Sequence, residues 1–362
     1  MTFLRLEARA EPSRAMAWAS PFIAALLMIA SAFVMFSLMG SSPIAALNAF
    51  FVAPLTTAYG IGEWLLKATP LILCAVGLAI GFRANVWNIG AEGQLTVGAI
   101  AGGGVALFAP LPDAAMLSVM ITAGIVCGML WAAIPALLRT RFNASEILVS
   151  LMLVYVAQLL LSWLVHGAWR DPEGFNFPQS AMFSQAATLP LLVEGARTHI
   201  GLPVALILAV VAWLLVSRTA AGYRMRVAGL APDAARYAGF SEARNVWCAL
   251  LIGGGAAGLA GVFEVAGPIG QLQPSVSPGD GFAAIIVAFV GRLHPVGIVL
   301  ASLLMSLLYI GGETAQLELG LPAAVTGLFQ GLLLFYLLAA DLFIHYRVRR
   351  ARSRAPVRGV SS

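Results

Sequence analysis

The chain has almost no lysine and little charge of either sign. Charged residues make up 10% of its 362 residues, and Lys67 is its only lysine. A nucleotide-binding P-loop needs a lysine at the end of the pattern GxxxxGK[ST]. Because Lys67 stands between a leucine and an alanine, as LLKA at 65–68, this sequence contains no such loop. An ATPase within it is therefore excluded.

Cysteine and histidine are also scarce. Cys74, Cys127 and Cys248 lie in apolar stretches without CxxC spacing, which predicts small core residues. The sequence has no HExxH or GxSxG pattern and no paired Cys/His cluster. We therefore expect neither a metal site nor a cofactor in this chain. The histidines are scattered over loops and span ends, which predicts solvated or interfacial side chains: His166, His199, His294 and His345.

Hydrophobic residues dominate the composition. They make up 60% of the chain and bring the mean hydropathy to +0.91, whereas soluble domains carry roughly 25% charged residues. A transmembrane helix needs about 20 apolar residues. The sequence therefore predicts an all-α integral membrane protein with about ten transmembrane helices. The ten apolar stretches are 17–39, 65–82, 89–108, 114–138, 147–165, 201–216, 246–263, 282–290, 296–310 and 325–343.

The first stretch contains a small-residue site, ASA at 30–32, of the kind at which signal peptides are cleaved. Its apolar run continues through Phe36, which is too long for an ordinary signal peptide. We therefore expect a retained transmembrane helix.

The arginines predict the orientation. Cytoplasmic segments carry an excess of Lys and Arg. With ten spans both termini lie on one side, and placing them in the cytoplasm leaves only Lys67, Arg170 and Arg197 outside. The arginines then in the cytoplasm are Arg5, Arg9, Arg14, Arg83, Arg139, Arg141, Arg218, Arg224, Arg226, Arg236, Arg244, Arg292, Arg347, Arg349, Arg350, Arg352, Arg354 and Arg358.

This orientation divides the chain into a cytoplasmic N-terminal tail at 1–16, a transmembrane domain at 17–343 and a basic cytoplasmic C-terminal tail at 344–362. Residues 217–245 form the large cytoplasmic loop of that domain. The arginines lie beside apolar spans and form no basic domain, so the expected surroundings are membrane lipid and not nucleic acid.

The eighth apolar stretch is too short to cross a bilayer. Its nine residues give about 13 Å of helix, against a hydrocarbon core of roughly 30 Å. The preceding segment, GPIGQLQPSVSPGDG at 267–281, is rich in residues that interrupt helices. A broken or re-entrant segment that lines a cavity fits this pattern, because transporters place substrate contacts on such segments. An ordinary periplasmic loop is the alternative.

The cytoplasmic loop contains a short helix signal. Pro232 suits a first helical turn, Asp233 complements its positive end, Arg236 lies toward the negative end, and Gly239 favours a stop. The predicted helix, 232–238, is too short to be stable alone in water. It needs a partner surface or, alternatively, rests on lipid headgroups.

Several polar side chains fall within or beside apolar spans, where they need a reason to be present. Glu92 and Gln94, with Asn88 one turn earlier, lie among small residues that permit close helix packing. We interpret them as mainly architectural, with substrate contact as the alternative. Glu264 and Gln271 are expected to face a translocation path, whereas Arg83, Arg139 and Glu146 are expected at the cytoplasmic boundary, where a salt bridge explains them.

Three motifs carry a resemblance to a known family: GFRANVWNIGAEGQ at 81–94, APDAARYAGF at 231–240 and SPGDGF at 277–282. Together they resemble the permeases of bacterial ABC importers in the branched-chain amino acid, ribose and nucleoside group. The NIGAEGQ form is most similar to the nucleoside (simple sugar) branch. The resemblance extends over about 65–343.

This resemblance implies a multi-pass protein of the bacterial inner membrane that carries a nucleoside. It implies three kinds of partner: an ABC ATPase subunit that binds ATP and Mg²⁺, a second homologous permease or a copy of this chain, and an extracytoplasmic substrate-binding protein. The implied coupling residues are Pro232, Asp233, Ala234, Ala235, Arg236, Tyr237, Ala238 and Gly239. The candidate pathway residues are Asn88, Glu92, Gln94, Glu264, Gln271, Ser277, Pro278, Gly279, Asp280, Gly281 and Phe282.

Other functions remain open at this point. A simple-sugar ABC permease shares the same motifs. An ion-gradient-driven carrier would explain Glu92 and Glu264 as proton or sodium sites but leaves the helix at 232–238 unexplained. An intramembrane enzyme would need a catalytic group that the sequence does not display. The loop at 165–200 is expected either to seat a binding protein or to cover the path.

Overall fold

The computed structural model describes residues 3–9, 11, 13–193 and 195–351. The chain divides into two compact units. One comprises residues 1–47 and 322–362, and the other comprises residues 48–321. Helix α2 (Pro43–Phe51) passes from the first unit into the second.

The first unit joins the two ends of the chain. It contains β1 (Phe3–Ala8), α1 (Arg14–Leu38), α13 (Ala324–His345) and β2 (Tyr346–Ala351). The strands pair antiparallel, with Phe3 opposite Ala351, in segments for which the sequence suggested only tails. Helices α1 and α13 pack together through an edge-on contact between the rings of Phe36 and Phe329, whose centroids lie 5.6 Å apart.

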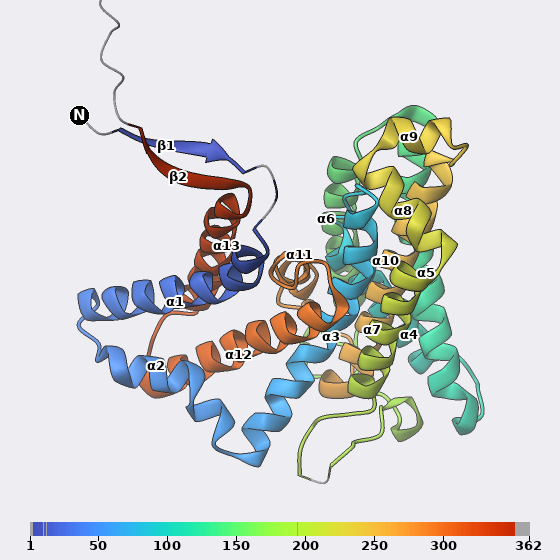
Figure 1. Cartoon of the computed structure of the whole chain (residues 1–362). Coiled ribbons are helices and arrows are strands. Elements are labelled where there is room, and N and C mark those ends of the chain that lie inside the picture. Colours follow the sequence, from blue (N-terminus) through green and yellow to red (C-terminus); the bar gives the residue numbers. More distant parts are fainter. Residues whose placement is uncertain (1–2, 10, 12, 194, 352–362) are drawn as a thin grey trace, which may run out of the picture. The chain divides into compact units, whose positions relative to one another are not determined.

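The second unit contains most of the helices. They are α3 (Ala58–Arg83), α4 (Ala91–Phe108), α5 (Asp113–Phe142), α6 (Glu146–His166), α7 (Gly201–Arg218), α8 (Ala220–Leu230), α9 (Pro232–Tyr237), α10 (Glu242–Glu264), α11 (Asp280–Val290) and α12 (Pro295–Leu319). Short turns occur at Ala53–Leu55 and Gln185–Ala187, and a π-helical turn at Val265–Ile269 follows α10. Helices α8 and α9 lie at one end of the unit, and the loop after α6 lies at the opposite end (Figure 1).

Eight of the described helices are long and apolar enough to cross a membrane: α1, α3, α5, α6, α7, α10, α12 and α13. Each corresponds to one of the ten predicted stretches. The two remaining stretches form α4, whose first turns carry Glu92 and Gln94, and α11, which has 11 residues. The structure therefore supports an all-α membrane protein with eight candidate spans and additional shorter apolar helices.

Helix α3 begins at Ala58, earlier than the stretch predicted at 65–82. The sequence signal is broken by Glu63, a charged residue that lowers local hydropathy. In the structure Glu63 is paired with Arg197, with 2.8 Å between Glu63 Oε1 and Arg197 Nε. A partner distant in sequence therefore permits the helix to extend. Lys67, which is near the start of the predicted stretch, consequently lies well inside α3.

Helix α10 is the centre of the second unit and packs against α3, α4 and α5. Glycines make these contacts close. A Cβ atom added to Gly258 would lie 2.2 Å from the carbonyl oxygen of Gly124 on α5, and one added to Gly98 on α4 would lie 2.3 Å from the carbonyl oxygen of Gly258. Small residues therefore bring three backbones together at one crossing.

We predict that Gly258→Ala destabilises the protein, by about 1–3 kcal/mol, because the added methyl group meets backbone that cannot move aside. Thermal unfolding of the purified protein in detergent measures the loss. The matched control is Gly327→Ala on α13, where an added Cβ meets nothing within 4 Å and alanine favours the helix. An equal decrease in Tm for both variants would contradict the role assigned to the α4–α5–α10 crossing.

Candidate functional site

Two helices, α4 and α11, begin deep within the second unit. Lys67 and Arg83 lie 16 positions apart on α3, which corresponds to about 24 Å at 1.5 Å per residue. Because Lys67 contacts Asp280 at the start of α11, that start lies far from the α9 end of the unit. A Cβ atom added to Gly281 would lie 2.3 Å from the backbone nitrogen of Glu92. The N-termini of α4 and α11 therefore meet at this depth.

The first turn of a helix presents N–H groups that have no partner within the helix. At α11 these groups find side-chain acceptors. Glu92 Oε2 accepts a hydrogen bond from the Gly281 N–H at 2.7 Å, and Ser277 Oγ accepts from the N–H groups of Gly279 at 3.2 Å and Asp280 at 2.9 Å. Gly279 has φ +104°, which favours glycine. In the motif SPGDGF, Ser277 thus caps the start of α11, Gly279 makes the turn, and Gly281 allows α11 to approach the start of α4.

The only lysine of the chain forms an ion pair at this point. Lys67 Nζ lies 3.4 Å from Asp280 Oδ2 and 5.6 Å from the ring centroid of Tyr309 on α12. The Asp280 side chain is 0% exposed and that of Lys67 is 16% exposed. The second carboxylate oxygen, Asp280 Oδ1, has no hydrogen-bond partner among the described residues. Sequence reasoning missed this pair, although a lone lysine beside an apolar span is itself a signal that a carboxylate partner is needed.

Asn88 and Gln94 bond to each other. Asn88 Nδ2 donates to Gln94 Oε1 at 2.8 Å, and Gln94 Nε2 donates to Asn88 Oδ1 at 3.0 Å. Asn88 Oδ1 also accepts from the Gly90 N–H at 3.0 Å. Both side chains are buried. These bonds fix the turn that precedes α4, which is an architectural arrangement.

Glu264 and Gln271 lie on either side of the π-helical turn that ends at Ile269. Gln271 Nε2 donates to Gln179 Oε1 at 3.1 Å, and the Leu272 N–H donates to Ser180 Oγ at 2.9 Å. Gln271 therefore contacts the loop after α6 and not the group around Glu92. Of the other motif residues, Pro278 and Phe282 are exposed.

His199 corrects an expectation. It was predicted to be solvated or interfacial, but it is 2% exposed. Its Nδ1 accepts a hydrogen bond from the Gly201 N–H at 3.0 Å, and its ring lies against Gly267 and meets Phe263 edge-on at 6.1 Å. Two glycines make room for the ring, which the histidine's sequence position alone does not reveal. Burial lowers the pKa of His199 to about 4.

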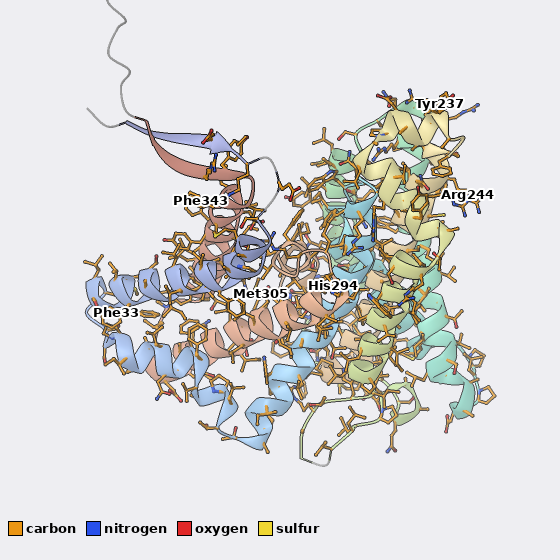
Figure 2. All side chains as sticks on the ribbon, viewed as in Figure 1. Phe33, Tyr237, Arg244, His294, Met305 and Phe343 are labelled. Atoms are coloured by element: carbon orange, nitrogen blue, oxygen red, sulfur yellow. The ribbon has the colours of Figure 1, made fainter. Side chains whose placement is uncertain are left out.

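The short helix predicted at 232–238 is present as α9, and Gly239 after it has φ +75°. Ala235 is buried, whereas Asp233 is exposed and Tyr237 is 97% exposed. Figure 2 shows Tyr237 and Arg244 at the surface of this end of the unit. The helix therefore presents most of its side chains outward.

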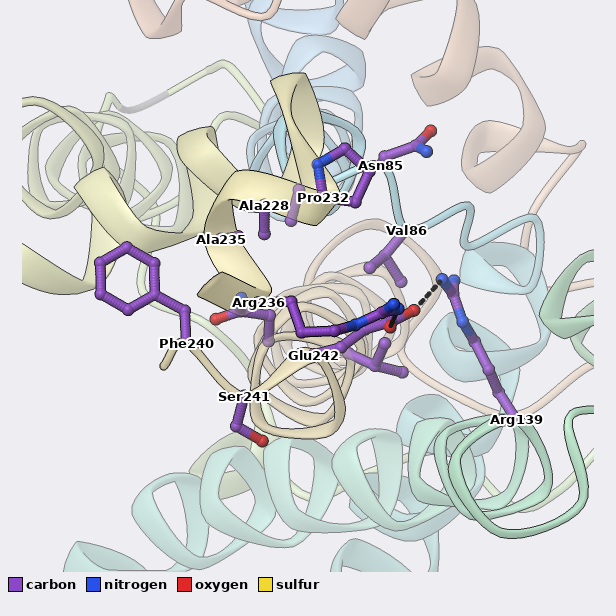
Figure 3. A pocket seen from close by; sticks show the side chains of 13 residues that line it. Asn85, Val86, Arg139, Ala228, Pro232, Ala235, Arg236, Phe240, Ser241 and Glu242 are labelled. Atoms are coloured by element: carbon purple, nitrogen blue, oxygen red, sulfur yellow. Dashed lines mark ion pairs between the residues drawn. The ribbon is translucent and has the colours of Figure 1, made fainter. Parts of the chain in front are cut away.

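A cavity of about 350 Å³ lies behind α9 and is lined by residues of α8, α9, α10 and the segment after α3 (Figure 3). Ion pairs cross its rim. Arg236 Nη2 on α9 lies 3.8 Å from Glu242 Oε2. The other carboxylate oxygen, Glu242 Oε1, lies 3.8 Å from Nη2 of Arg139 at the end of α5. Arg139 also pairs with Glu146 at the start of α6, and this pair confirms the predicted salt bridge for these two residues. Arg83, which was included in the same prediction, donates from Nε and Nη2 to the carbonyl oxygen of Leu293 at 3.1 and 2.8 Å. Charged side chains thus link α9 to the ends of three long helices.

No group of three or more His, Cys, Asp or Glu side chains within the described ranges is arranged to hold a metal ion.

Comparison with known proteins places this arrangement in a family. The family described as branched-chain amino acid transport system/permease component matches residues 60–338. A glucose ABC transporter permease protein of Haloferax volcanii is 38% identical over 97% of this chain and 95% of its own length. A guanosine ABC transporter permease protein of Bacillus subtilis is 30% identical over 87% of this chain and 91% of its own length, and a nucleoside ABC transporter permease protein of Lactococcus lactis is 28% identical over 87% and 88%.

The chain therefore belongs to the family of branched-chain amino acid transport system permease components, and within it to the ABC importer permeases of the sugar and nucleoside group. It is a multi-pass inner-membrane subunit and not an enzyme, and the ATPase is a separate chain. A putative glucose ABC transporter permease protein of Haloferax volcanii and a second guanosine ABC transporter permease protein of Bacillus subtilis are each 28% identical to this chain. Assembly with a second permease is consistent with these pairs.

We predict that the protein loses stability as the pH falls. His199 is neutral in the fold because burial lowers its pKa from 6.5 to about 4, whereas in the unfolded chain it takes up a proton near pH 6.5. The contribution of His199 to the free energy of unfolding is fully present above about pH 6.5. It decreases by about 3 kcal/mol as the pH falls toward 4. Protonation of Nδ1 also removes the acceptor for the Gly201 N–H.

The measurement is Tm as a function of pH for the wild type and for His199→Asn, whose side-chain oxygen retains an acceptor but does not take up a proton. Carboxyl groups titrate in both proteins, so the difference between the two curves isolates the histidine. Parallel curves between pH 7 and pH 4 would contradict the prediction.

Proposed function

We propose that this chain forms the membrane path of an ABC importer for a nucleoside. The observation that supports this most strongly is the combination of an exposed α9 with a deep polar centre in which Lys67 and Asp280 form an ion pair. A path with compensated charge suits a neutral polar solute better than an ion or a zwitterion, since an unpaired charge in a bilayer is costly. The nucleoside relatives at 30% and 28% identity support this choice.

A simple sugar is the second candidate solute. The relative at 38% identity is described as a glucose permease. Sugars and nucleosides share neutral charge and neighbouring hydroxyl groups, so both are compatible with the same polar centre.

The proposed orientation places both termini and α9 in the cytoplasm. Arg83, Arg139 and Arg218 at the helix ends near α9 support it through the positive-inside rule. Ten membrane segments then comprise the eight long helices together with α4 and α11, which meet end to end. The tail boundaries at 1–16 and 344–362 belong to the same proposal.

Residues 232–239 are proposed to dock on the ATPase subunit, which binds ATP and Mg²⁺. An exposed aromatic ring on a short helix suits a protein groove, since aromatic anchors dominate interface energies. Resting on lipid headgroups is less suitable, because α9 buries Ala235 and offers few large apolar side chains besides Tyr237. The ion pairs from Arg236 to Glu242 and Arg139 then join the docked helix to the membrane helices.

The loop after α6 is proposed to seat an extracytoplasmic binding protein. It exposes large apolar side chains at Phe175, Phe177 and Met182 at the end of the unit opposite α9. Exposed apolar clusters of this kind mark interaction sites. Ser277 to Phe282, Glu264 and Gln271 are proposed to line the path between the two ends.

The first test is uptake of labelled adenosine by cells with and without this chain, challenged by excess guanosine, ribose or glucose and by a protonophore while ATP stays high. We expect uptake that needs the chain, withstands the protonophore and is inhibited by nucleosides. Inhibition by glucose or ribose alone would assign the sugar branch instead. Uptake that requires neither this chain nor ATP would contradict the proposal.

We predict that Tyr237→Ala and Phe175→Ala weaken different partner contacts. Both rings are more than nine-tenths exposed, so neither substitution disturbs the fold. Tyr237→Ala is expected to reduce recovery of the ATPase subunit on copurification by at least tenfold, as for loss of a central aromatic anchor, and to leave binding-protein association unchanged. Phe175→Ala is expected to do the reverse. Equal effects of both variants on both partners would contradict the assignment of the two ends.

A further inference from the structure

We propose that Lys67 and Asp280 together bind hydroxyl groups of the transported solute. The ligand class is a neutral molecule with neighbouring hydroxyls, such as the ribose of a nucleoside or a sugar ring. This inference rests on the proposed function and names the side chains that contact the solute within it.

The first step of the argument is unused hydrogen-bonding capacity. Asp280 is fully buried, yet its Oδ1 atom has no partner within the part of the chain that the structure describes. A buried acceptor without a partner is unfavourable, particularly a charged one. Lys67 carries three N–H donors, and the hydrogen bond described for its ammonium group runs to Asp280 Oδ2 at 3.4 Å, which is long for a charge-assisted bond.

The second step is chemical complementarity. A hydroxyl group both donates and accepts a hydrogen bond. Two neighbouring hydroxyls can donate to the free carboxylate oxygen and accept from the ammonium group. Lys67 and Asp280 compensate each other's charge, so binding of a neutral solute leaves neither member of this pair without its partner.

The third step concerns the neighbouring polar groups, which are already engaged. Glu92 caps Gly281, Ser277 caps Gly279 and Asp280, and Asn88 and Gln94 bond to each other. These groups hold the ends of α4 and α11 in place. Among the described motif residues at this depth, Asp280 is the one that has a buried oxygen atom without a hydrogen-bond partner.

The fourth step is the aromatic surroundings. The ring of Tyr309 lies beside the Lys67 ammonium group, and Trp64 lies one helical turn before Lys67 on α3. The indole N–H of Trp64 donates to the carbonyl oxygen of Leu303 on α12 at 2.7 Å, which fixes that ring. Rigid rings with a polar edge are suited to cover the apolar face of a sugar or a base. Lys67 is partly exposed, so it is the member of the pair that a solute reaches first.

The test uses the assembled importer in proteoliposomes with ATP. Uptake of adenosine is compared with uptake of 2′-deoxyadenosine and 3′-deoxyadenosine for wild type, Asp280→Asn and Lys67→Met. If wild type carries a sugar instead, glucose and its deoxy analogues are used. We expect wild type to prefer the fully hydroxylated solute by roughly 10- to 100-fold in kcat/KM, the range for loss of a hydrogen bond to a charged group.

Asp280→Asn and Lys67→Met are expected to reduce this preference to less than about threefold, because each removes one of the two charged groups that the hydroxyls would contact. The matched control is Glu313→Gln. It removes a carboxylate that also acts electrostatically on Lys67 but leaves the ion pair in place, so the preference should remain.

A buried charge without its partner can prevent folding. The double variant Lys67→Met/Asp280→Leu removes both charges and provides the second measurement. If it folds and carries all solutes with the wild-type preference, the pair is only structural and the inference is wrong. If it folds and has lost the preference, the inference holds. If wild type carries neither nucleosides nor sugars, the proposed function itself fails, which is a distinct result.

Discussion

The structure depends on how two helix starts are accommodated in the interior of the second unit. Each helix begins with N–H groups that lack an internal partner, and within a bilayer such groups must be satisfied by the protein. At α11 the acceptors are Glu92 and Ser277, and the close approach of Gly281 to the Glu92 backbone brings the start of α4 to the same point. Carboxylates are also the side chains that complement the positive ends of helices. Glu92 is therefore required first by the backbone, and the proposed place for solute arises from the oxygen that Asp280 leaves without a partner.

Helices α3 and α10 connect this centre to α9. Helix α3 ends at Arg83, and a Cβ on Gly229 of α8 would lie 2.1 Å from the Arg83 carbonyl oxygen. Helix α10 begins at Glu242 within the ion pairs that reach Arg236. Because close glycine contacts hold α10 against α4 and α5, these helices resist bending relative to one another. The proposed docking helix and the proposed solute contacts thus lie at opposite ends of the same rigid elements, which is the geometry that a lever requires.

Sequence reasoning identified what depends on local pattern. Eight long apolar helices, the short helix before Gly239 and the pair between Arg139 and Glu146 follow from hydropathy, turn chemistry and charge. It failed where partners are distant in sequence. Glu63 concealed the start of α3 because its partner, Arg197, is remote, and His199 is buried because Gly201 and Gly267 provide the space. The antiparallel strands at the two ends were missed for the same reason, since each pairs only with the other. A hydropathy window averages over one segment of the chain, whereas each of these features depends on contacts between two segments that are distant in sequence.

The scarcity of lysine gains a physical meaning from the fold. Arginine supplies the other strong cationic side chains, whose planar, always charged groups suit ion pairs at helix ends, as at Arg139. Lysine instead offers a compact charge with three donors that can point in different directions. One donor pairs with Asp280, and a guanidinium group in that place would engage both carboxylate oxygens side by side and fill the acceptor that is now free. The identity of the cation therefore determines whether Asp280 retains an oxygen for the proposed solute contact, and a lysine at position 67 leaves that oxygen available.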